Sequence, residues 1–71
     1  MKLEQVLPAL RDGQVITRTK IYNNGQSVWF FKIENNRLKF HVLFPNGDGV
    51  NWAYYALKTD DIFADNWEVA G

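Results

Sequence analysis

Residues 27–44 contain the feature that most constrains the fold, a pair of alternating segments on either side of Asn35-Asn36. Asparagine tolerates the positive φ angles that a two-residue hairpin turn requires. A turn at this point predicts a strand register in which Trp29 lies opposite Val42. One face of the hairpin is then entirely apolar and is expected to belong to the core: Trp29, Phe31, Ile33, Leu38, Phe40 and Val42.

The opposite face of this hairpin is mixed, with aromatic rings beside cations. In the predicted register Lys32 lies opposite Lys39, and two facing lysines destabilise a sheet unless they separate into solvent or an anion lies between them. Glu34 is the one carboxylate that this face offers. We therefore treat this surface as a candidate interaction face, formed by Phe30, Lys32, Lys39 and His41.

The length of 71 residues suits a single domain, residues 1–71, near the lower size at which one core supports folding. The chain has no cysteine, so no disulfide or thiolate metal site can stabilise it. Its three Trp, three Tyr and five Phe are more aromatic residues than so small a core is expected to bury. We expect association into a homodimer or homotetramer together with an aromatic-lined ligand site.

The charge balance also bears on possible partners. Eight acidic and eight basic residues give a formal net charge of zero, which argues against a general nucleic-acid binder. The first residues begin no signal peptide, and no apolar run approaches the roughly 20 residues that span a bilayer. We expect a cytoplasmic protein without a membrane partner.

Apolar spacing predicts a short amphipathic helix from Leu3 to Leu10 that ends at Gly13. Pro8 lacks an N–H group and favours a late helix start or a kink. Alternating residues predict further strands at 14–22 and 50–56, with turns at 23–25 and 45–49.

Near the end of the chain, Thr59 is expected to cap a short helical turn whose Ile62 and Phe63 point inward. Residues 66–69 are expected to close the chain as an edge strand, and Trp67 to pack its ring into the core. The predicted fold class is α+β: an N-terminal helix, an antiparallel four- to five-stranded meander sheet and a short C-terminal helical turn.

Sequence signatures of catalysis are missing. The chain has no phosphate-loop, dinucleotide-binding or zinc-ligand pattern, and His41 is its only histidine. Four carboxylates near the C-terminus (Asp60, Asp61, Asp65 and Glu68) are interpreted as charges on a solvated helical turn. We expect no enzyme activity, no catalytic residues, no metal and no cofactor.

Residues 61–69, Asp-Ile-Phe-Ala-Asp-Asn-Trp-Glu-Val, resemble the closing motif of the Thoeris anti-defence protein 2 family. In that family the chain ends as Asp, two apolar residues, Ala, a polar residue, Asp, Trp, Glu and an aliphatic residue. The helix, the turn at 11–13 and the strand that contains Arg18 are similar too, and Trp52 resembles a tryptophan upstream of the motif. The chain departs from the family at Asn66, where Asp is usual, in the segment 18–22, where the family has Arg-x-Gly-Trp, and in its shorter central hairpin.

Members of this family bind cyclic nucleotide signals of bacterial immune systems, especially cyclic ADP-ribose isomers, hold them without hydrolysis, and form dimers or tetramers with pockets between protomers. The resemblance implies a phage-type anti-defence protein that sequesters such a signal in the cytoplasm of the bacterial host. An adenine ring could stack on aromatic rings, a pyrophosphate could pair with cations, and ribose hydroxyls could bond polar groups. The candidate ligand-binding residues are Tyr22, Trp52 and Tyr54 for stacking, Arg18 and Lys20 for phosphate, and Asn51 and Asp61 for ribose.

Alternatives remain open at this stage. If the strand at 50–56 alternates strictly, Trp52 shares a face with Val50 and Tyr54, and this face belongs either to the core or to a pocket. The mixed hairpin face could instead dock onto a bacterial defence protein, as an anti-CRISPR-like inhibitor does, or bind single-stranded nucleic acid. Loss of activity in a folded Arg18→Ala variant would favour signal sequestration, whereas loss in Lys32→Glu or Lys39→Glu would favour the hairpin face.

Overall fold

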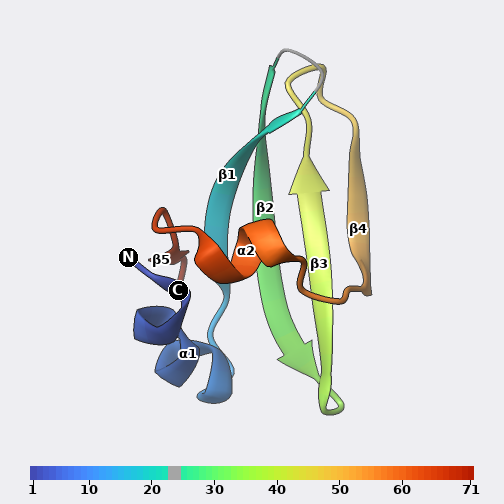
Figure 1. Ribbon diagram of the computed structural model, residues 1–71. Coiled ribbons are helices and arrows are strands. Elements are labelled where there is room, and N and C mark those ends of the chain that lie inside the picture. Colours follow the sequence, from blue (N-terminus) through green and yellow to red (C-terminus); the bar gives the residue numbers. More distant parts are fainter. Residues whose placement is uncertain (23–24) are drawn as a thin grey trace.

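The computed structural model describes residues 1–22 and 25–71, so the turn expected at Asn23-Asn24 lies outside the described residues. Five strands form one antiparallel sheet in the order β4-β3-β2-β1-β5 (Figure 1). The elements are α1 (Leu3–Arg11), β1 (Ile16–Tyr22), β2 (Gly25–Glu34), β3 (Arg37–Leu43), β4 (Gly49–Tyr54), α2 (Thr59–Phe63) and β5 (Glu68–Val69). This arrangement confirms the expected α+β class with its N-terminal helix, meander sheet and short C-terminal helical turn.

The central hairpin has the predicted register. Trp29 lies opposite Val42 and Lys32 opposite Lys39, and the other pairs follow in step. Asn35 and Asn36 have φ angles of 54° and 62°, as a tight hairpin turn with two left-handed residues requires.

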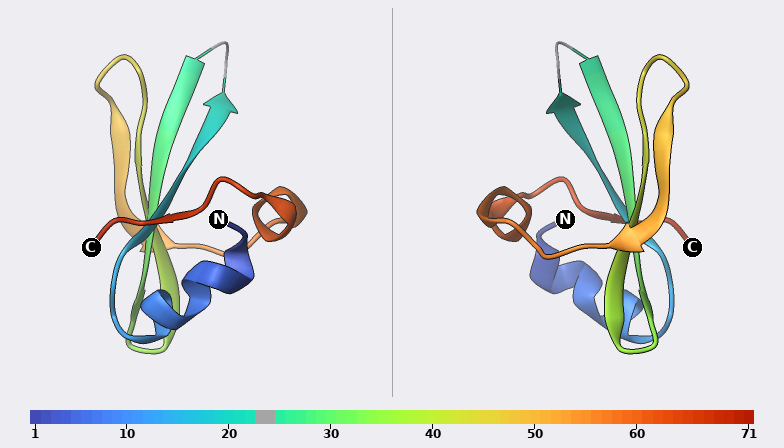
Figure 2. Two further views of the ribbon diagram at one scale, coloured as in Figure 1. Left: turned by 90° about the vertical axis from the view of Figure 1, so that its left-hand side faces the viewer. Right: turned by 90° about the vertical axis from the view of Figure 1, so that its right-hand side faces the viewer.

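Both helices lie on one side of the sheet, as the two side views in Figure 2 show. We call this side the covered face and the other side, on which neither helix packs, the open face. Alternation along β2 sends Phe31 to the covered face and Phe30 to the open face. The sheet therefore has one face that makes the core and one that remains available for contacts.

The core lies between α1, the covered face and Trp67. Val6 and Leu10 of α1 pack with Ile16, Phe31 and Trp67, all of which are buried. The indole of Trp67 is fully buried, and its Nε1 donates a hydrogen bond of 2.9 Å to the carbonyl oxygen of Asp61. The prediction that Trp67 packs into the core is confirmed.

The first helix begins at Leu3 and continues through Pro8, so the predicted late start is wrong. A proline inside a helix removes one backbone hydrogen bond. Burial of Val6 and Leu10 on the same helix offsets that loss. None of the described helices is both long enough and apolar enough to cross a membrane.

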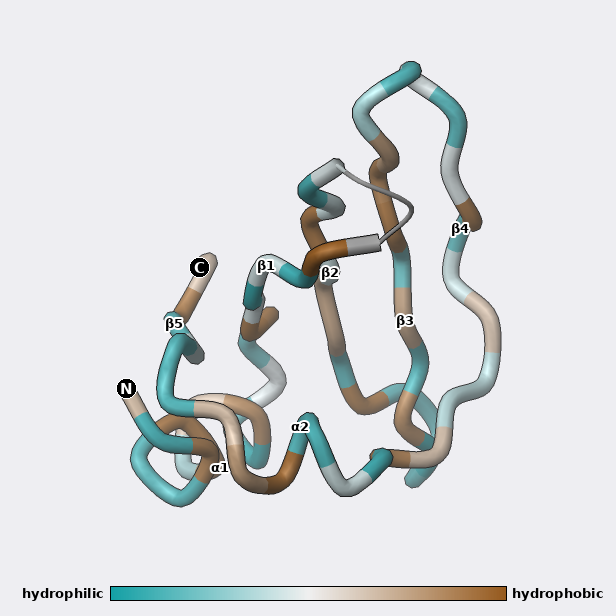
Figure 3. The backbone as a smooth tube through the Cα atoms, turned by 45° about the horizontal axis from the view of Figure 1, so that its top comes forward, coloured by the Kyte–Doolittle hydropathy of each residue, from teal (hydrophilic) through white to brown (hydrophobic). Residues whose placement is uncertain are grey.

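The second helix differs from its prediction in two ways. Lys58, not Thr59, is its N-cap residue. Ile62 and Phe63 are 50% and 81% exposed, whereas Asp61 is fully buried. In Figure 3 the chain changes from hydrophilic to hydrophobic along α2, and both apolar residues at the end of this helix are exposed.

A β-bulge in β4 decides the position of Trp52. Phe40 pairs with Ala53 and Val42 pairs with Val50, so two residues of β4 lie opposite one residue of β3. Trp52 consequently contacts open-face side chains, whereas Val50 lies opposite Val42, a residue of the covered face. The expectation that Val50 and Trp52 share a face is therefore wrong.

Candidate functional site

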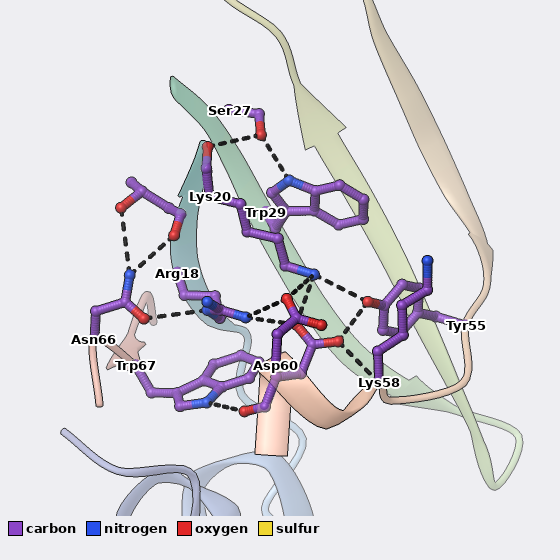
Figure 4. Close-up of polar contacts among 11 residues, drawn as sticks. Arg18, Lys20, Ser27, Trp29, Tyr55, Lys58, Asp60, Asn66 and Trp67 are labelled. Atoms are coloured by element: carbon purple, nitrogen blue, oxygen red, sulfur yellow. Dashed lines mark hydrogen bonds and ion pairs between the residues drawn. The ribbon is translucent and has the colours of Figure 1, made fainter. Parts of the chain in front are cut away.

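Two groups of polar and aromatic side chains stand out, one on each face of the sheet. The first is centred on Asp61 of α2, whose side chain is fully buried. Figure 4 shows four of the residues around it, Arg18, Lys20, Tyr55 and Lys58. Asp61 Oδ1 lies 2.6 Å from Arg18 Nη1 and 2.6 Å from Lys20 Nζ. Its Oδ2 accepts hydrogen bonds from the Tyr55 hydroxyl at 2.5 Å and from the Lys58 backbone N–H at 3.1 Å.

Strand β1 supplies both cations of this group because alternate residues of a strand point to the same face. Lys20 Nζ also lies 3.0 Å from the Tyr55 hydroxyl and 4.3 Å from the centroid of the Trp29 ring. Arg18 Nε donates to Asn66 Oδ1 at 3.1 Å, and its guanidinium carbon lies 5.5 Å from the Trp67 ring centroid. Each cation is thus engaged by partners within the chain.

The protonation states follow from these contacts. Burial would raise the pKa of Asp61, but hydrogen bonds from Lys20, Tyr55 and the Lys58 backbone outweigh it and leave this pKa below its ordinary value. Burial and the hydrogen bond to Asp61 both raise the pKa of the Tyr55 hydroxyl. Asp61 is therefore an anion with four donors, and its carboxylate has no acceptor position left for a ribose hydroxyl.

A hollow of about 450 Å³ opens beside this group, between β1 and the start of α2. Arg18, Lys20 and Trp29 line one part of it, and Lys58 and Asp60 line another. The first two cations are neutralised by Asp61 and are also within 3.5 and 3.7 Å of Asp60. An anion in this hollow would have to compete with two carboxylates for the same donors.

The second group lies on the open face and has a different character. Phe30 on β2, His41 on β3 and Trp52 on β4 form a row of rings across three strands. Ring centroids are 5.8 Å apart between Phe30 and His41 and 5.6 Å apart between His41 and Trp52. His41 Nδ1 lies 2.8 Å from the Val50 carbonyl oxygen, which can only accept, so Nδ1 carries the proton of this bond.

Cations flank this row. Lys32 Nζ lies 4.2 Å from the centroid of the Trp52 ring. Next to it, Arg37 and Lys39 lie against the ring of Tyr54, at 4.8 Å and 5.4 Å from its centroid. We call the seven residues of this surface the aromatic-basic platform: Phe30, Lys32, Arg37, Lys39, His41, Trp52 and Tyr54.

Glu34 resolves the conflict between the two facing lysines. Its carboxylate lies 2.5 Å from Lys39 Nζ and 3.5 Å from Lys32 Nζ. The hydrogen bond from Lys39 is the main cause that lowers the pKa of Glu34, and it raises the pKa of Lys39 in turn. One carboxylate among three cations leaves the platform with a local positive charge in a chain of zero net charge.

The structure divides the predicted ligand-binding residues between the two faces. Arg18, Lys20 and Asp61 meet on the covered face, whereas Trp52 and Tyr54 join the platform. Asn51 is exposed within the β4 bulge. The backbone of Tyr22 ends β1, and its side chain lies outside the described part of the structure. The predicted interaction face at Phe30, Lys32, Lys39 and His41 and the predicted stacking residues of β4 therefore form one surface.

Sequence reasoning missed one functional position and left a second out of the candidate site. Tyr55, which was missed, supplies a hydroxyl to Asp61 from the covered face, and Arg37 adds a guanidinium to the platform. Arg37 directly follows the hairpin turn, opposite Glu34, so the predicted register already placed it on the same face as Lys39. For Tyr55 no local signal exists, because its partner Asp61 belongs to another element.

Together, the fold and these two groups define a class: a small α+β domain with a helix-covered sheet face and an open face that carries aromatic rings and cations. Comparison with protein families then identifies the relatives. The chain belongs to the Tad2-like family, the Thoeris anti-defense 2-like domain, whose family model matches residues 1–70. This confirms the resemblance seen in the closing motif and associates the chain with Thoeris anti-defence. Searches of curated proteins and of solved structures found no match.

Proposed function

We propose that this chain is an anti-defence sponge that binds a cyclic nucleotide immune signal, such as a cyclic ADP-ribose isomer, and holds it without hydrolysis. The observation that carries the proposal is the aromatic-basic platform. Nucleotide bases stack on flat rings, and phosphates pair with ammonium and guanidinium groups. Membership in a Thoeris anti-defence family supports a signal of the bacterial immune system as the ligand.

Distances within the platform suit this ligand class. The Lys32 ammonium lies over the Trp52 ring, 4.2 Å from its centroid, so a base that displaced this ammonium from the ring or stacked beside it would bring its phosphate close to a cation. Tyr54 is 64% exposed and has Arg37 and Lys39 at its ring, which repeats the same pairing of ring and cation. Two such pairs suit a ligand with two stacking or charged groups.

Sequestration without chemistry is also part of the proposal. Hydrolysis of a phosphate or glycosidic bond needs a general base or acid with a suitable pKa. Glu34, the carboxylate of the platform, is held as an anion by Lys39, and its pKa is lowered, away from the neutral range. His41 donates its Nδ1 proton to the Val50 carbonyl and lies between the rings of Phe30 and Trp52, which favours a role in the stacking row. We accordingly propose that the chain is no enzyme and uses no cofactor.

The test is calorimetric titration of the purified protein with cyclic ADP-ribose isomers and with cyclic di- and trinucleotides. Heat denaturation of the complex, followed by mass spectrometry of the released ligand, then shows whether the ligand is intact. Tight binding with intact ligand supports the sponge. A stoichiometry of one ligand per chain indicates a site on one open face, and one ligand per two chains indicates a site between copies in a homo-oligomer.

Matched charge reversals locate the site. Lys32→Glu should weaken binding at least about tenfold, because it removes a phosphate partner from the platform and introduces repulsion. Lys58→Glu changes net charge equally, but lies on the covered side at the start of α2, and should leave affinity near the wild-type value. Equal losses in both variants would contradict a site on the platform.

A second candidate function uses the same platform. A half-buried row of aromatic residues beside cations also suits a protein partner, since interface cores are enriched in aromatic residues and arginine. An absence of heat with every nucleotide would contradict the sponge and favour this inhibitor of a bacterial defence protein. Capture of a defence protein that is lost in Lys32→Glu and retained in Lys58→Glu would then support it.

A further inference from the structure

A third surface, separate from the platform and from the group around Asp61, lies where α1 and α2 meet. The side chain of Phe63 is 81% exposed, and the neighbouring Ile62 is 50% exposed. Apolar side chains exposed to this degree on a short helix contribute little to the core of a chain this small. Their position at the surface is thus a signal for a contact with another molecule.

Beside Phe63 the surface is hollowed. A depression of about 410 Å³ separates the start of α1 from the end of α2, and Phe63 forms one of its walls. Leu3, Ile62 and Ala64 supply further apolar lining. An apolar projection and a partly apolar depression therefore lie next to each other on the same patch.

Charges of both signs surround this depression. Lys2, Glu4 and Asp65 line it, and all three are exposed. Within the described part of the chain, the ion pairs involve other residues and leave these three side chains unpaired. The patch thus offers one cation and two anions that are available to a partner.

We infer that a second copy of this chain docks on this patch by two-fold symmetry, each copy inserting its Phe63 ring into the depression of the other. A two-fold interface uses the same patch on both subunits, so it must be complementary to itself. The patch meets this condition in shape because the projecting Phe63 lies beside the depression. It meets the condition in charge because Lys2 lies on the same patch as Glu4 and Asp65. The inference gives a surface to the homo-oligomer that the sequence predicts, and it rests on that prediction alone.

The test compares two exposed apolar residues. Sedimentation equilibrium over a range of concentrations should show wild-type protein at twice the 8.3 kDa chain mass. Phe63→Ser should raise the dimer dissociation constant at least about thirtyfold, the size of effect that a central aromatic anchor has. Ile21→Ser removes a side chain that is 74% exposed on β1 and should leave the dimer unchanged.

Charge exchange provides a second test that does not depend on the apolar contact. Lys2→Glu should weaken the dimer, because it places only negative charges around both depressions. Adding Glu4→Lys to that variant restores a charge of each sign and should recover most of the lost association. Circular dichroism confirms that every variant is folded.

Three results would each overturn the inference. The wild-type chain could remain monomeric, the dimer could survive Phe63→Ser, or Ile21→Ser could dissociate the dimer as much as Phe63→Ser does. Nucleotide titration of the Phe63→Ser monomer separates this outcome from the sponge itself. Retained binding would leave the sponge in place whatever the interface, and the absence of binding in wild type would count against the sponge without bearing on the dimer.

Discussion

Lys20 on β1 and Asp61 on α2 form a buried ion pair, with 2.6 Å between Lys20 Nζ and Asp61 Oδ1. The lysine side chain is 13% exposed and the aspartate side chain is fully buried. Because α2 has only five residues, it cannot bury a long apolar stripe, and its attachment to the sheet relies on this pair and on its Arg18 and Tyr55 partners.

Neutralising Asp61 should therefore destabilise the whole domain. Asp61→Asn leaves two largely buried cations with only the exposed carboxylate of Asp60 nearby, and it is expected to lower the free energy of unfolding by about 3 kcal/mol. Asp60→Asn is the matched control, because the neighbouring side chain is 59% exposed and should change stability by less than about 0.5 kcal/mol. Urea unfolding followed by circular dichroism measures both, and equal effects would contradict the role of Asp61.

The same carboxylate predicts a dependence of stability on pH. The pKa of Asp61 in the folded protein is below its ordinary value of 3.8, so its contribution to stability is fully present above that value. The contribution is lost as the pH falls from 3.8 through the lower pKa of the folded state. Urea midpoints between pH 5 and pH 2 should consequently fall more steeply for wild type than for Asp61→Asn.

Glu34 provides the control for this experiment. Its pKa is also lowered, through Lys39 and Lys32, so it contributes acid sensitivity of its own to both proteins. The difference between wild type and Asp61→Asn removes that common part. Parallel curves for the two proteins would show that Asp61 is not the group responsible.

The hairpin turn makes a prediction about backbone strain. Asn36 has a φ angle of 62°, in the left-handed region that β-branched residues avoid. Asn36→Val should cost about 1–2 kcal/mol of stability, whereas Asn36→Gly should cost nothing or stabilise slightly. Thermal unfolding of the two variants measures this contrast, and similar melting temperatures would contradict the turn geometry.

How far the sequence predicts this protein depends on how local each feature is. The register between β2 and β3 follows from a two-residue turn and alternating residues within 18 positions, and it is confirmed pair by pair. The position of Trp52 depends on a bulge between β3 and β4 across a longer connection, which alternation alone does not reveal. Alternation therefore assigns the hairpin residues to the correct faces of the sheet, but it assigns Val50 to the wrong face.

The α2 segment shows a second limit. Apolar Ile62 and Phe63 were expected inside and a carboxylate outside, which is the ordinary preference of these residues. The structure reverses this preference because β1 presents Arg18 and Lys20 to the helix, and a buried anion satisfies both. Only the pairing of segments more than forty residues apart creates that environment, so neither the buried Asp61 nor the internal role of Arg18 could be derived from local sequence.

This reversal changes what is expected of Arg18 and Trp52 in ligand binding. Trp52→Ala removes a ring from the platform and should reduce affinity for a cyclic nucleotide by about 1–3 kcal/mol, the value of one stacked base, with stability close to wild type. Arg18→Ala removes a partner of Asp61 and Asn66 and should mainly lower stability. Calorimetric affinity combined with urea unfolding separates the two effects. A stable Arg18→Ala variant that no longer binds, beside a Trp52→Ala variant that binds normally, would move the ligand from the open face to the hollow next to α2.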